Sequence, residues 1–133
     1  MDKPDSYGAN WILKAMIAVA VSDGQLHDRE VELIRQIYQD QSGRSVTAEG
    51  VRAVAKATKS DLSSEIAAAA KSLDRNIKEE MIRAAYLVLL ADELIVQQES
   101  KELKDIAAAL EISETDYGAI LRDLALWLAE VRR

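Results

Sequence analysis

The chain of 133 residues contains no cysteine, no phenylalanine and a single proline, at position 4. Without cysteine there can be no disulfide, no thiolate nucleophile and no zinc site with Cys ligands. Because the one proline stands near the beginning, the rest of the chain is free of the strongest helix breaker. Aromatic residues make up only 5%, and Ala, Leu, Glu and Ile dominate. This composition indicates an all-helical domain.

Basic residues are outnumbered, with 17 Lys and Arg against 23 Asp and Glu, so the net charge is −6. Such an average field repels a phosphate backbone, and nucleic acid is not expected as a partner. The first residues, Met1–Ser6, do not resemble a signal peptide. The longest apolar run, Ala84–Ala91, is far shorter than the roughly 20 residues that span a bilayer. We therefore expect one cytoplasmic domain over 1–133, with no membrane insertion.

An internal duplication organises the chain. The stretch Ala18–Ile37 is an apolar run, a polar turn and an amphipathic run, and the stretch Leu87–Ile106 repeats this pattern without gaps. The equivalent pairs are Asp23 with Asp92, Glu30 with Glu99, Ile34 with Leu103, and Ile37 with Ile106. Acids are frequent in this chain, so the alignment of the apolar positions is the stronger signal. The repeat halves are predicted at about 10–40 and 79–109.

Apolar residues at helical spacing predict about seven helices. Their expected ranges are about 8–22, 27–41, 48–58, 62–73, 77–91, 97–110 and from 113 onward. Thr47 and Ser113 are suited to cap two of these helices. The second half of the helix over 77–91 is apolar nearly all round, and this helix is expected to be the most buried. The predicted fold is all-α: a compact bundle with an internal pseudo-twofold repeat of two helix-turn-helix pairs.

The last helix carries an apolar stripe that includes Trp127. Residues 119–133 have two interpretations, a core helix or an amphipathic helix that binds a membrane or a partner. The core is favoured because the polar face is not rich in lysine. Trp11 and Trp127 are accordingly both expected to be buried anchors.

Two segments carry a family resemblance. Ala-Val-Ser-Asp-Gly-Gln-Leu-His-Asp-Arg-Glu-Val-Glu over 20–32 and Leu-Ala-Asp-Glu-Leu-Ile-Val-Gln-Gln-Glu-Ser-Lys-Glu over 90–102 resemble the paired signatures of the TerB-like family. That family is associated with tellurite resistance. The resemblance implies an all-helical fold with an internal pseudo-twofold and an acidic surface that binds divalent metal ions. It also implies a role in bacterial stress response beside a membrane-associated partner.

Residue by residue, Asp23 and Glu30 match the first signature of the family, and Asp92 and Glu99 match the second. Glu93 stands where the family usually has glycine, and the second turn lacks the further acids that often fill it in relatives. The resemblance therefore implies that the first turn is the better metal site.

Hard cations such as Ca²⁺ take oxygen ligands, which Asp23, Asp28, Glu30 and Glu32 can supply around the first turn. The acid ladder of an EF-hand is absent. The competing interpretation is structural, because an acid in the first turn of a helix is stabilised by the helix dipole and an Asp after a helix can form an Asx turn. His27, the only histidine, is expected to be an exposed residue without a metal.

The sequence leads to three hypotheses of function. The first is a non-enzymatic, metal-responsive module of a bacterial tellurite-resistance or stress-response system, with Ca²⁺ or another divalent cation and a protein partner. The alternative is a metal-independent scaffold for protein–protein interaction. The third is a hydrolase that uses carboxylates and a metal. Ser22, Asp23 and His27 lie on one turn and are not expected to converge as a catalytic site, so no catalytic residue is assigned.

Overall fold

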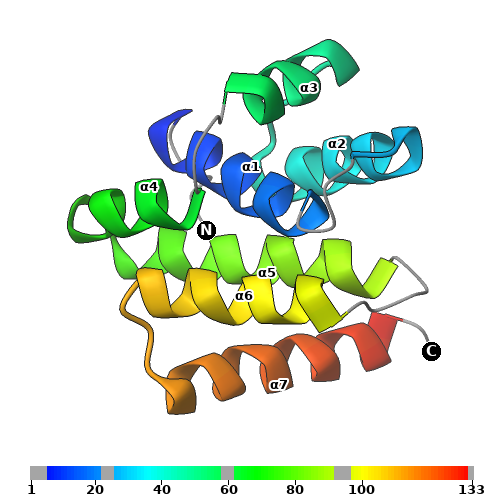
Figure 1. Cartoon of the computed structure of the whole chain (residues 1–133). Coiled ribbons are helices and arrows are strands. Elements are labelled where there is room, and N and C mark those ends of the chain that lie inside the picture. The colour runs from blue at the N-terminus through cyan, green and yellow to red at the C-terminus, as the bar shows by residue number, and fades with distance from the viewer. Residues whose placement is uncertain (1–5, 22–25, 58–61, 92–96, 132–133) are drawn as a thin grey trace.

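The computed structural model describes residues 6–21, 26–57, 62–91 and 97–131. All regular structure in these ranges is helical, as predicted. The elements are α1 (Ser6–Ala20), α2 (Asp28–Ser42), α3 (Ala48–Ala57), α4 (Leu62–Ala69), a 3-10 turn η1 (Ala70–Ser72), α5 (Arg75–Ala91), α6 (Gln97–Ala109) and α7 (Glu114–Val131). Figure 1 shows α3 and α7 at opposite ends of the bundle, with α1, α5 and α6 between them.

Among the helix starts that the structure describes, three have a side-chain cap. In each case an oxygen accepts a hydrogen bond from the backbone N–H three residues on: Thr47 from Gly50 at 2.9 Å, Asp74 from Ile77 at 3.0 Å, and Ser113 from Asp116 at 3.1 Å. A cap of this kind stabilises a helix by about 1 kcal/mol. The caps at Thr47 and Ser113 were predicted. The Asp74 cap starts α5 two residues before the predicted position.

Gly50, in the first turn of α3, lies close to the side chains of Val46 and Thr47. Glutamate at position 50 would complete a capping box with Thr47. A Cβ atom at Gly50, however, would lie 3.0 Å from Val46 Cγ2 and 3.2 Å from Thr47 Oγ1. A side chain there would require Val46 and Thr47 to shift by a few tenths of an ångström.

Of the helix ends within the described ranges, two are followed by a residue in the left-handed conformation. Gly43, at φ 73°, follows α2, and its N–H donates to the carbonyl of Gln39 at 2.8 Å. Glu111, at φ 62°, follows α6. Its N–H donates to Ala108 O at 3.0 Å, and the Ile112 N–H donates to Ala107 O at 3.0 Å. These paired bonds form a Schellman motif, whose left-handed position glycine occupies best.

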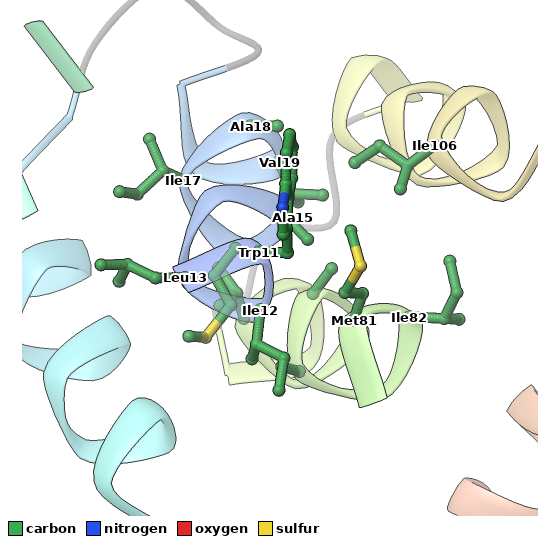
Figure 2. Close-up of a cluster of buried hydrophobic side chains, with 14 of the residues drawn as sticks. Trp11, Ile12, Leu13, Ala15, Ile17, Ala18, Val19, Met81, Ile82 and Ile106 are labelled. Atoms are coloured by element: carbon green, nitrogen blue, oxygen red, sulfur yellow. The ribbon is translucent and has the colours of Figure 1, made fainter. Parts of the chain in front are cut away.

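The core is built around α1. Every described side chain from residue 8 to residue 20 is buried except Asn10 and Lys14. Figure 2 shows this cluster, in which Trp11 and Ile12 of α1 lie with Met81 and Ile82 of α5 and with Ile106 of α6. The prediction that 77–91 is the most buried helix is wrong. Helix α1 contacts α2, α3, α4, α5 and α6, whereas α5 leaves several side chains half-buried on its outer face.

The predicted apolar stripes of α2 and α6 are confirmed. Their buried residues are Val31, Ile34, Ile37 and Tyr38 in α2, and Leu103, Ile106 and Ala107 in α6, with Leu110 one residue past its end. Both stripes recur every three or four residues, the period that places side chains on one face of a helix.

The helix pairs of the two repeat halves pack reciprocally. Helices α1 and α5 form the main contact of the bundle. Helix α2 contacts both α1 and α5, and α6 likewise contacts both α5 and α1. Exchanging the α1–α2 pair with the α5–α6 pair leaves this pattern unchanged, as expected of two pairs related by a pseudo-twofold.

The apolar stripe of α7 is only partly covered. Ile120 and Leu124 are buried, but Trp127, on the same stripe, is 51% exposed. The prediction of a buried Trp127 is therefore wrong, whereas Trp11 is buried as predicted. The stripe was identified correctly, but its burial depends on the neighbouring helices, and the first half of α7 has better cover than the second. Among the described residues, no helix combines the length and the apolar character that crossing a bilayer requires.

Candidate functional site

The first acidic turn lies between α1, which ends at Ala20, and α2, which begins at Asp28. Of its predicted metal ligands, Asp28, Glu30 and Glu32 are described, and Asp23 lies outside the described residues. Asp28 and Glu30 point to different environments. Asp28 is exposed and Glu30 is buried.

Glu30 supports the start of α2. Its Oε1 accepts a hydrogen bond from the backbone N–H of His27 at 3.0 Å, the reach-back contact of a capping box. The side chain is only 4% exposed. A carboxylate in this position also meets the positive end of the helix dipole. The structure thus supports the structural interpretation of Glu30.

Asp28 forms an ion pair with Arg52 of α3. Another guanidinium nitrogen of Arg52 donates to the carbonyl of Leu26 at 3.1 Å. A cationic side chain from a different helix therefore contacts two oxygen atoms of the turn. Sequence reasoning missed Arg52, because it is 24 residues from Asp28 and no local pattern connects the two.

The other polar residues of this turn have separate roles. Both carboxylate oxygens of Glu32 accept from Nη1 of Arg35, at 2.8 and 2.7 Å, and Arg35 Nε donates to the carbonyl of Val46 at 2.8 Å. The Arg35 contact ties α2 to the segment before α3. The His27 side chain is exposed, as predicted.

The second acidic turn cannot be compared with the first. Asp92 and Glu93 lie outside the described residues. Glu99 belongs to α6, but its side chain is also outside the described set. In the part of the chain that the structure describes, no three His, Cys, Asp or Glu side chains gather closely enough to hold a metal ion. Because Asp23, Asp92 and the Glu99 side chain are not part of that comparison, metal binding stays a prediction.

A groove lies on another face of the molecule, between α2, α5 and α7. It consists of two adjoining hollows of about 330 and 500 Å³, within the roughly 300–1,000 Å³ typical of ligand clefts. Gln41, Leu87 and Trp127 line both hollows. The remaining lining residues are Leu33, Gln36, Ile37, Asp40, Glu80, Arg83, Asp123 and Leu124. We call this surface the α2–α7 groove.

Tyr117, near the start of α7, is a perturbed ionisable group. Burial raises the pKa of its phenol, and the nearby Tyr86 raises that pKa further. Both effects disfavour the phenolate, because a buried charge loses hydration and two like charges repel. Tyr117 lines a separate hollow with Lys104, Asp105 and Glu114, so it is not part of the α2–α7 groove.

These two surfaces, the first acidic turn and the α2–α7 groove, are the candidate sites. Comparison with known proteins does not add a third or assign a role to either: no family model, no curated protein and no solved structure matches this chain.

Proposed function

We propose that this chain is a non-enzymatic TerB-like module of a bacterial tellurite-resistance or stress-response system, and that it works by binding a protein partner. The TerB-like assignment rests on the two signatures over 20–32 and 90–102. The partner is proposed to be a membrane-associated component of the same system. The observation that carries the interaction role is the exposure of Trp127 in the α2–α7 groove.

A half-exposed tryptophan in an apolar groove supports an interaction role. Trp127 and Leu126 are the large hydrophobic side chains that the described surface exposes, at 51% and 63%. Tryptophan is enriched among the residues that dominate binding energy at protein interfaces. A contiguous apolar groove with polar edges is typical of such interfaces.

The polar residues of the first turn support the same proposal. Glu30 caps α2, Asp28 pairs with Arg52, and Glu32 pairs with Arg35. Each of these carboxylates therefore already has a partner within the helical framework. This pairing favours an interaction module over a site that keeps its carboxylates for a ligand.

A divalent metal at the first turn is the second candidate. The specific observation in its favour is that Arg52 contacts both the Leu26 carbonyl and the Asp28 carboxylate. These two oxygens therefore already bind one positively charged group, the Arg52 guanidinium. Carbonyl and carboxylate oxygens are also the ligands that Ca²⁺ prefers.

Survival of the host on tellurite tests the proposed function. A strain that lacks the gene is expected to be more sensitive to tellurite, and the parent gene is expected to restore growth. Trp127→Ser should restore it poorly, and Leu126→Ser, at the neighbouring position outside the groove, should restore it well. A deletion strain that tolerates tellurite and related oxidants like the parent strain would refute the assignment to this stress response.

A further inference from the structure

We propose that the α2–α7 groove binds a basic amphipathic helix of a protein partner. This inference rests on the proposed function and adds the chemical class of the partner. It is based on the shape, the apolar floor and the charged rim of the groove.

The floor of the groove is apolar and is formed by three helices. Leu33 and Ile37 lie one turn apart on α2, Leu87 comes from α5, and Leu124 and Trp127 lie about one turn apart on α7. Trp127 provides the largest accessible apolar surface, whereas Ile37 and Leu124 are nearly covered. A helix that inserts apolar residues at positions i, i+3 or i+4, and i+7 fits a floor of this kind.

The rim of the groove is acidic. Asp40 of α2 and Asp123 of α7 are exposed, and neither forms an ion pair within the described ranges 6–21, 26–57, 62–91 and 97–131. Among the described lining residues the one cation is Arg83, which pairs with Glu80 at 3.1 Å and with Glu79 at 3.9 Å. The charge of these described lining residues is therefore negative in sum, and Lys or Arg residues flanking the apolar stripe of the partner would face it.

The charge of the whole chain supports the same class of partner. A net charge of −6 attracts a basic helix at long range and raises its rate of association. A second copy of this chain would instead bring two acidic rims together. An anionic membrane surface would be repelled in the same way. Charge complementarity thus favours a basic protein segment over a second copy of the chain or an anionic membrane.

Peptide binding tests this proposal. The probe is a synthetic Leu/Lys amphipathic helix of about 18 residues, or five turns. Its controls are a scrambled peptide of the same composition and a Leu/Glu helix. In a Trp11→Phe variant, the emission of Trp127 should shift to shorter wavelength with the Leu/Lys helix. The scrambled and acidic peptides should bind at least about tenfold more weakly.

Matched variants locate the binding site by calorimetry. Trp127→Ser should weaken binding of the Leu/Lys helix by at least about tenfold, as expected of a central aromatic contact. The pair Asp40→Asn and Asp123→Asn should weaken binding at low salt and reduce its salt dependence. Leu126→Ser should bind like the parent, as should the pair Asp105→Asn and Glu114→Gln, which changes the net charge equally at the other hollow.

Four results would overturn the proposal: equal binding of the acidic helix, binding unaffected by Trp127→Ser, self-association through Trp127 in the absence of peptide, or a Trp127 shift with anionic vesicles. These results leave the proposed function testable by itself. If tellurite survival still depends on Trp127, only the class of partner is wrong. If the peptide binds but the deletion strain has no stress phenotype, the stress-response role is wrong.

Discussion

Arg52 of α3 pairs with Asp28, the first residue of α2, although 24 residues separate them along the chain. Through this ion pair and its bond to the Leu26 carbonyl, Arg52 brings a positive charge to the turn where the sequence predicts a divalent cation. An internal cation and a bound metal would compete for the same oxygens. The metal hypothesis can therefore be tested by removing the competing cation, Arg52, and by removing a predicted metal ligand, Asp23.

The first prediction is that calcium raises the melting temperature of the parent chain, because a ligand that binds only the native state stabilises it. Arg52→Gln should increase this calcium-dependent rise by removing the competing charge. Asp23→Asn should abolish most of it while leaving metal-free stability equal or slightly higher. Differential scanning fluorimetry over a calcium series measures all three. An identical calcium dependence in Asp23→Asn and the parent would show that this turn binds no metal.

The second prediction separates the structural role of Glu30 from a metal role. Glu30→Ala removes the acceptor for the His27 N–H and should lower the free energy of unfolding by about 1–2 kcal/mol without calcium. Glu30→Gln keeps an acceptor oxygen and should lose less than half as much. Urea unfolding in the presence of a chelator provides the measurement. Equal losses in the two variants would contradict the capping role.

The third prediction concerns the end of α6. Glu111 is left-handed, at φ 62°, and an acid there also faces the negative end of the helix dipole. Glu111→Gly should raise stability by about 0.5–1 kcal/mol, which corresponds to about 2–5 °C in melting temperature. Glu111→Gln removes the charge but keeps the side chain. It should therefore raise stability by less than Glu111→Gly, because only the electrostatic cost is removed. A decrease in melting temperature for Glu111→Gly would contradict the Schellman geometry.

The fourth prediction concerns the two tryptophans, which are 8% and 51% exposed. In Trp127→Phe the remaining Trp11 should be protected from iodide, and in Trp11→Phe the remaining Trp127 should be quenched several-fold more strongly. Stern–Volmer constants in the native state measure the contrast. Equal constants for the two variants would mean that α7 is covered in solution.

The fifth prediction is a pH dependence. Since the pKa of Tyr117 is raised in the folded chain, the unfolded chain loses this proton first as the pH rises above the ordinary tyrosine value. Stability should therefore fall from that pH up to the raised pKa, and Tyr117 should have no such effect at lower pH. Tyr117→Phe should reduce the loss in melting temperature between pH 8 and about pH 11. If parent and variant lose equally, the perturbation of Tyr117 is absent.

The helices could be predicted from the sequence because their signals are local. Thr47 and Ser113 act through the backbone three residues away, and the stripes of α2 and α6 follow one helical period. The burial of α1 and the exposure of Trp127 could not be predicted in this way, because both depend on which helices pack nearby. The contact of Arg52 with Asp28 could not be predicted for the same reason, because it depends on how α3 packs beside α2. The predicted metal ligands Asp23, Asp92 and Glu99 remain predictions, since the described side chains do not include them.

The packing of α1 on α5 also has a consequence for synthesis on the ribosome. The end of α5 at Ala91 is 71 residues after the end of α1 at Ala20. At about 5–20 residues per second, roughly 4–14 s pass between the translation of these two points. During that time the nascent α1 segment lacks the helix with which it makes its most extensive contact. Chaperone binding and aggregation of the nascent chain should therefore concentrate on this segment.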